Sequence, residues 1–274
     1  MTKPEMFRRT VLAAAMLLFS MTANGALAGE AAWADIKPAI FGDRAILPAT
    51  PGMLAMTTPY RSEDDREVPV AVSASFVDGR TVRTVTVVID ENPMPVSAVF
   101  RFDAPRRSVS IATRMRFDGP SPIRTIVEAS DGRLYMSESY VKTSGLGACA
   151  SPPVNNPEDA LARLGDMELV HGKAPSGNMS SATRTARLKI MHPNLTGLQM
   201  DQITLQHIPA RYINTIEVRE GDEPVLTVES GIALSENPEI EFDYPLNGAE
   251  TLSVYAKDTD GTEFRHDFPV GTGS

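Results

Sequence analysis

The residue with the clearest capacity for chemistry is Cys149, the one cysteine in the 274-residue chain. Its neighbours Gly145, Gly147, Ala148 and Ala150 are all small. A cysteine thiolate is a strong nucleophile that needs access to its target, and glycine leaves the flanking backbone free to adopt many conformations. The pattern predicts a mobile arm, with Gly145 and Gly147 giving arm flexibility, so that Cys149 can enter a narrow cleft on another protein.

The charges around this arm predict an ordinary thiol. No lysine or arginine occurs between Lys142 and Arg163, so no basic neighbour in the sequence lowers the thiol pKa. We expect Cys149 to be accessible, with a pKa near the reference value of ~8.5, and to be alkylated in the native protein about as fast as in the unfolded one. Two alternatives are an inert exposed thiol and a thiol covered by the segment that follows.

Other chemistries have weaker support. A nucleophilic cysteine usually needs a histidine base held by a third group, and His171, the nearest histidine, lies in a polar segment without such a partner. We therefore expect no enzyme activity from the chain alone. We also expect no metal and no cofactor, because no phosphate loop or dinucleotide fingerprint is present and the histidines are scattered: His171, His192, His207 and His266.

The first 28 residues read as an export signal. A basic head is followed by an apolar run over 11–21 and by Ala26-Leu27-Ala28, which fits the small-x-small rule for cleavage. The pair Arg8-Arg9 is compatible with either the general or the twin-arginine export route. We expect a mature protein that begins at Gly29 and resides in the periplasm.

The net charge excludes two classes of partner. The full chain carries a formal charge of −9, and removal of residues 1–28, which hold three basic residues and one acidic residue, changes this to about −11. An acidic exported protein is a poor ligand for nucleic acid or an anionic membrane. In an oxidising compartment cysteines are usually paired, so a single one is a reactive thiol, an intermolecular bridge or a buried small residue.

The rest of the sequence is dominated by short strand-like runs with turns between them, which favours antiparallel β-sandwiches. Between the two β-rich regions, 156–164 predicts a short helix that starts at Asn156 and Pro157. The first β-rich region has expected strands at 68–74, 82–89, 96–102, 108–116, 123–130 and 134–142. The second has them at 186–191, 212–220, 224–230, 239–242, 251–257 and 263–270.

Several motifs together resemble the two subunits of the sulfur-oxidation carrier SoxYZ, fused in one chain. Asn92-Pro93-Met94-Pro95, with the strand around it, resembles a SoxY signature, and the arm around Cys149 resembles the glycine-rich swinging arm that ends SoxY. The SoxZ-like motifs are His192-Pro193-x-x-Thr196-Gly197, Ile208-Pro209-Ala210-x-Tyr212-Ile213, Gly231 to Pro238, and Asp258-x-Asp260-Gly261.

This resemblance implies an all-β protein with two immunoglobulin-like antiparallel β-sandwich domains joined by a flexible linker with a short helix. The expected organisation is a signal peptide at 1–28, a SoxY-like sandwich at 29–144, a cysteine arm and linker at 145–182, and a SoxZ-like sandwich at 183–274. Two features differ from the family: the arm is internal, and alanines at 148 and 150 replace its glycines.

The resemblance also implies a function. It predicts a periplasmic carrier that holds a sulfur-containing intermediate on Cys149 and presents it to partner enzymes. The fused form is most similar to SoxYZ-like carriers associated with quinoprotein dehydrogenases in methylotrophic bacteria, so the implied partners are sulfur-processing or redox enzymes, including a quinoprotein dehydrogenase or a cytochrome. The alternative is a non-catalytic adaptor or chaperone for a pyrroloquinoline-quinone alcohol dehydrogenase system, with Cys149 incidental.

Overall fold

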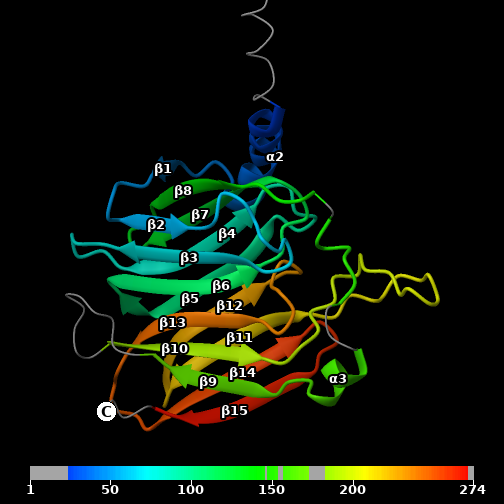
Figure 1. Ribbon diagram of the computed structural model, residues 1–274. Helices are drawn as coiled ribbons and strands as arrows, with labels where there is room; N and C mark the ends of the chain where they lie inside the picture. The colour runs from blue at the N-terminus through cyan, green and yellow to red at the C-terminus, as the bar shows by residue number, and fades with distance from the viewer. Residues whose placement is uncertain (1–23, 146, 154–156, 173–182, 271–274) are drawn as a thin grey trace, which may run out of the picture. The chain divides into compact units, whose positions relative to one another are not determined.

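The computed structural model (Figure 1) divides into two compact units, residues 1–42 and 43–274. The residues that it describes are 24–145, 147–153, 157–172 and 183–270. Most of the predicted signal peptide, the predicted helix cap Asn156 and part of the predicted linker therefore lie outside the described residues.

The described part of the first unit is helix α2 (Asn24–Phe41). It is 18 residues long and includes Pro38. The rings of Trp33 and Phe41 lie 6.5 Å apart along it. Across the described residues, no helix has both the length and the apolar character needed to cross a membrane.

The second unit is built from strands, which confirms the all-β prediction. The structure gives these bounds: β1 (Ile46–Pro48), β2 (Leu54–Thr57), β3 (Val68–Ser75), β4 (Val82–Ile89), β5 (Val96–Arg106), β6 (Ser108–Met115), β7 (Ser121–Ala129), β8 (Leu134–Val141), α3 (Pro157–Ala162), β9 (Met167–His171), β10 (Thr183–Ile190), β11 (Ile213–Glu220), β12 (Glu223–Ser230), β13 (Glu239–Pro245), β14 (Thr251–Asp258) and β15 (Glu263–Pro269).

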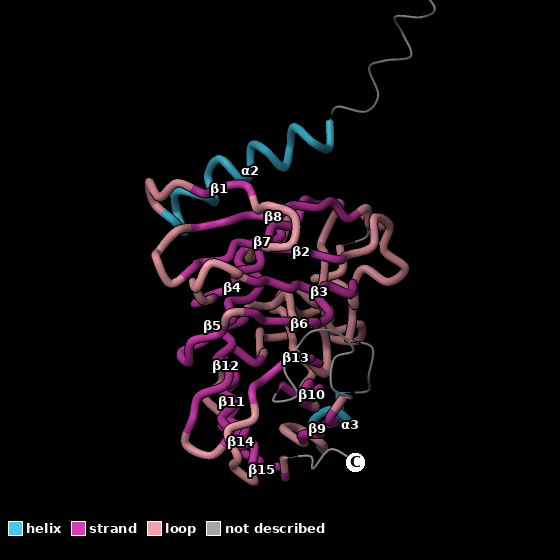
Figure 2. The backbone as a smooth tube through the Cα atoms, turned by 90° about the vertical axis from the view of Figure 1, so that its left-hand side faces the viewer, coloured by secondary structure: helices cyan, strands magenta, loops and turns pink. Residues whose placement is uncertain are grey.

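These strands form two sheets, which Figure 2 shows as two layers. One has the order β1-β8-β7-β4-β5-β12-β11-β14-β15 and the other β2-β3-β6-β13-β10-β9. The short strand β1 runs parallel to β8, and the remaining pairings among these strands are antiparallel. Each half of the chain supplies strands to both layers, so each half is a sandwich in itself.

The two sandwiches join edge to edge, because strands of one half pair directly with strands of the other. In one layer β5 pairs with β12, with Phe100 opposite Val228. In the other β6 pairs with β13, with Ile111 opposite Phe242. Buried aliphatic and aromatic side chains form one cluster that continues across both joints. Continuous sheets therefore fix the position of one half against the other.

The segment predicted as arm and linker needs one correction, while the predicted domain boundaries themselves remain predictions. Strand β9 lies inside it and pairs with β10 from His171 opposite Ala186 to Met167 opposite Ile190. Its side chains are half-buried or exposed, so the strand lacks the buried apolar positions that mark a strand in a sequence. The predicted short helix is present as α3.

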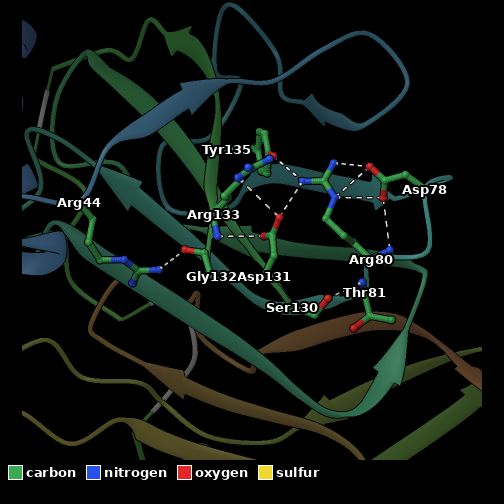
Figure 3. Close-up of polar contacts among 9 residues, drawn as sticks. All are labelled: Arg44, Asp78, Arg80, Thr81, Ser130, Asp131, Gly132, Arg133 and Tyr135. Carbon is green, nitrogen blue, oxygen red and sulfur yellow. Dashed lines mark hydrogen bonds and ion pairs between the residues drawn. The ribbon is translucent and has the colours of Figure 1, made fainter.

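Polar contacts around Arg80 fix two turns in the first half (Figure 3). Its guanidinium forms ion pairs with Asp78 at 2.6 Å and with Asp131 at 3.5 Å, and it donates to the hydroxyl of Tyr135. Asp131 lies in the turn between β7 and β8, and Asp78 lies between β3 and β4. These contacts are structural and leave the chemistry to the region around Cys149.

Candidate functional site

Cys149 lies in a tight turn that is docked against the protein. The amide of Ala150 donates to the carbonyl of Gly147 at 3.1 Å, and that of Ser151 donates to Ala148 at 3.3 Å. The exposed fraction of Cys149 is 0%. The expectation of an accessible thiol on a mobile arm is therefore wrong for this conformation, and the alternative of a covered thiol describes it better.

The two arm glycines allow the backbone of this turn to adopt its conformation. Gly145 has φ of 76° and Gly147 has φ of 73°, a left-handed conformation that residues other than glycine adopt only with strain. In the docked arm these glycines therefore define one conformation. Their role as a source of arm flexibility remains a prediction about the undocked state.

Side chains from both halves of the chain hold the arm. From the first half, Asp118 Oδ1 accepts a hydrogen bond from the amide of Cys149 at 3.1 Å. From the second half, Thr196 Oγ1 donates to the carbonyl of Cys149 at 2.6 Å, and Gln199 Nε2 donates to the carbonyl of Ser151 at 2.9 Å. The green arm and the yellow segment that holds it meet on the right-hand side of Figure 1.

Asn92 positions the first-half side of this site. Its Oδ1 accepts from the amide of Asp118 at 2.9 Å, and its Nδ2 donates to the carbonyl of Arg116 at 2.8 Å. The side chain is buried, so one amide group fixes the backbone on both sides of Phe117. Asn92 belongs to the SoxY-like motif in the sequence, but that motif does not indicate this positioning role.

Arg116 connects the site to the second half. Its Nη1 donates to the carbonyls of Ile232 at 3.1 Å and Leu234 at 2.7 Å, and its amide donates to Ala233 at 2.7 Å. The side chain is buried. Burial lowers its pKa, while Cys149 and then Glu236 act in the opposite direction. A buried cation therefore lies near the thiol, although no basic residue is close to Cys149 in the sequence.

The segment carrying Thr196 and Gln199 is itself fixed by hydrogen bonds. Gln199 Oε1 accepts from the amide of Thr196 at 3.1 Å, so the amide group that holds the arm is oriented from its other end. Asn194, with φ of 43°, receives the Ile213 amide on its Oδ1 and donates to the carbonyl of Ser235. Asp118, Thr196 and Gln199 form the receptor for the arm, and hydrogen bonds outside the arm also hold the segment that carries Thr196 and Gln199.

His192 stabilises the same segment through a hydrogen bond with the backbone of Asn194. Its Nδ1 accepts from the amide of Asn194 at 3.0 Å, which leaves Nε2 to face Asp258 at 3.5 Å. Burial lowers the pKa of His192, so the neutral ring with hydrogen on Nε2 matches these partners. Asp258 in turn accepts from Arg211 at 2.9 Å. These contacts make His192 part of a structural network.

The environment of Cys149 raises the pKa of its thiol to about 12. Burial is the largest cause, because it disfavours the charged thiolate. The carboxylate of Asp118 acts in the same direction through its charge and its hydrogen bond with the thiol, and Arg116 opposes it. The predicted near-normal pKa is wrong for the docked arm, because these groups reach the sulfur through the fold.

His171 is not placed to act as a base for Cys149. Its Nε2 faces the carbonyl of Pro269 at 2.9 Å and its Nδ1 faces the hydroxyl of Tyr244 at 3.2 Å. Both partners belong to strands of the second half. No cluster of metal-ligating side chains occurs among the described residues.

Two family models match the chain. Residues 37–149 match the family "Sulfur oxidation protein SoxY", and residues 173–269 match "Sulphur oxidation protein SoxZ". The first match ends at Cys149 itself, and the second contains both Thr196 and Gln199. Among curated proteins, none matches the chain.

Solved structures with some likeness include the sulfur carrier protein SoxY from Chlorobium limicola f thiosulfatophilum. It is 25% identical, with a TM-score of 0.37, over 42% of this chain and 95% of that one. The superoxide reductase (neelaredoxin) from Ignicoccus hospitalis, in its E23A form, is 11% identical with a TM-score of 0.29, over 34% and 80%. The two family matches in tandem, on either side of the docked arm, show that the chain is a fused SoxYZ-like member of the SoxY and SoxZ sulfur-oxidation families.

Proposed function

We propose that this protein is a periplasmic sulfur carrier, which holds a sulfur-containing intermediate covalently on Cys149 and presents it to partner enzymes. One observation carries the proposal. Cys149 is the last residue of the SoxY match, and its carbonyl accepts a hydrogen bond from Thr196, which lies in the SoxZ match. Two halves that build one receptor around a single thiol suit a protein whose purpose is to control that thiol.

The carrier cycle requires the arm to leave its receptor. Three hydrogen bonds to Asp118, Thr196 and Gln199 hold the turn. Because each of these bonds adds only about 1 kcal/mol of net stability, the docked arm can open on a functional timescale. Once released, the thiol returns toward its ordinary pKa and accepts cargo as a disulfide- or persulfide-type adduct. This step breaks the S–H bond and forms an S–S bond, and the proposed partner enzymes supply the sulfur group and accept the proton and the two electrons that are released.

The proposed setting follows from the export signal read in residues 1–28. The proposed partners are sulfur-processing enzymes, as the Sox family descriptions suggest. A quinoprotein dehydrogenase or a cytochrome is the finer proposal, which rests on the resemblance of the fused form to carriers associated with such enzymes.

A substitution of the sulfur tests the function. Cys149→Ser keeps a small polar side chain in the turn, so the protein should fold with an unchanged midpoint of thermal unfolding and yet lose its function in the host. Ala150→Ser is the matched control, since Ala150 is exposed and this change adds the same hydroxyl to the arm while it keeps the thiol. Full complementation by Cys149→Ser would contradict the carrier.

A second candidate is the adaptor for a quinoprotein dehydrogenase, and the complete burial of Cys149 favours it. In that case the thiol is a small packing residue and its loss changes stability alone. The substitution pair above separates the two functions, because an adaptor tolerates Cys149→Ser as well as Ala150→Ser.

A further inference from the structure

The side chain of Cys149 is fully buried in the docked arm. Two cavities border the arm. The one lined by Arg116, Ala148, Ser151 and Gln199 measures about 10 Å³, too little for more than a single water, which needs roughly 10–15 Å³. The other, lined by Ser144, Ala148, Ser151 and Pro152, measures about 470 Å³, but Cys149 lines neither of them. A sulfur adduct adds at least one large atom to that side chain, so the docked arm accommodates the bare thiol far better than a loaded one.

The charges around the sulfur also favour the neutral thiol over an anionic adduct. Asp118 accepts a hydrogen bond from the amide of Cys149 and also interacts with the thiol. A persulfide or sulfonate adduct removes the S–H hydrogen and places a negative charge close to this carboxylate, an arrangement that repels. Arg116 offers the opposite charge and acts against this repulsion, but Asp118 has the larger effect on the sulfur, and its carboxylate lies 3.1 Å from the Cys149 amide nitrogen.

We infer that the receptor distinguishes the empty carrier from the loaded one: it docks the arm when Cys149 is a thiol and releases it when Cys149 bears an anionic sulfur group, with Asp118 as the specificity-determining residue. The inference rests on the proposed carrier function. Its consequence is directional, because partner enzymes then meet mainly loaded arms while empty thiols stay protected.

The test replaces the adduct with side chains of fixed charge. Cys149→Asp puts a carboxylate in the receptor, and Cys149→Asn is a neutral side chain of nearly the same size. The readout is hydrogen exchange of the arm amides at Cys149, Ala150 and Ser151, which are donors in the docked state. Circular dichroism and thermal unfolding verify that each full-length variant is folded.

The expected result is a loss of arm protection by about tenfold or more in Cys149→Asp relative to Cys149→Asn, because two close carboxylates repel. Adding Asp118→Asn to Cys149→Asp should restore protection, since it removes one of the two charges. Equal protection in the Asp and Asn variants, or no rescue by Asp118→Asn, would overturn the role of Asp118. Neither result involves sulfur cargo, so failure here is distinguishable from failure of the carrier function.

Discussion

The reactivity of Cys149 depends on whether its sulfur lies in the receptor or in water. Docked, the thiol has a pKa of about 12 against an ordinary value of 9.0. The docked state therefore favours the protonated thiol, and its stabilisation is complete below the ordinary pKa. As the pH rises from about 9 towards 12, the free arm ionises first and docking weakens.

Alkylation kinetics measure this directly. At about pH 8, iodoacetamide should label the native protein roughly tenfold to a hundredfold more slowly than protein in urea, as three hydrogen bonds of about 1 kcal/mol each allow. Between about pH 8 and pH 10 the native rate should rise more steeply than the unfolded rate, because docking is lost as well as protons.

Thr196→Val provides the comparison for this experiment, because it keeps the shape and removes the hydroxyl, which donates to the Cys149 carbonyl and accepts from the Leu198 amide. Its native labelling rate should exceed that of the wild type by at least about fivefold to tenfold, the factor expected for the lost hydrogen bond to the arm alone. Equal rates for native and unfolded wild-type protein would show that the arm is free in solution.

At this scale the sequence singled out Cys149, whose role as the attachment residue stays a prediction, and it gave the wrong surroundings for the thiol. The small residues around Cys149 correctly indicate a segment without its own anchors. They hold no information about a receptor, because Asp118 and Thr196 lie far away in the chain and meet Cys149 only through the fold. The lack of nearby basic residues was misleading for the same reason, since Arg116 reaches the site from the end of β6.

At the scale of elements, the joint between the halves contains a buried ion pair. Arg106 of β5 lies 3.1 Å from Asp243 of β13, and both side chains are less than 10% exposed. The pair is close without being aligned as a hydrogen bond, and Arg106 Nη2 donates instead to the carbonyl of Asp243. Burial lowers the pKa of Arg106 and raises that of Asp243, so each charge depends on the other.

Arg106→Met should therefore destabilise the protein by about 3–5 kcal/mol, because it leaves Asp243 buried without its partner. Arg101→Met is the matched control on the same strand, since the Arg101–Glu229 pair also crosses the joint but is exposed. It should cost less than about 1 kcal/mol. Urea denaturation measures both changes, and equal losses would show that burial of the pair is unimportant.

The elements also show how far strand patterns extend. Strand β3 alternates buried and more exposed side chains along its length, and the sequence predicted it almost to the residue. Strands β2 and β9 were missed, because β2 is four residues long and β9 buries none of its side chains fully. Both strands form because they pair with a neighbour, β2 with β3 and β9 with β10. A local sequence pattern does not show which strand will be the neighbour.

At the scale of the molecule, edge-to-edge pairing joins the SoxY-like half and the SoxZ-like half into one folded unit. The β5–β12 and β6–β13 pairings make each sheet continuous through both halves, and the arm forms hydrogen bonds with side chains of both halves. The sequence indicated two sandwiches and could not specify this joint, because strand edges carry no composition signal for their partner. Fusion fixes the ratio of the halves and keeps the receptor beside its own arm.

The most direct test of the central claim is the intact mass of the protein purified from the periplasm of its host with free thiols blocked. We expect the mass of residues 29–274 plus a sulfur-containing adduct that reduction removes and that Cys149→Ser lacks. A population that carries only the bare, blocked thiol, under conditions in which the protein is needed, would contradict the assignment of Cys149 as the carrier residue.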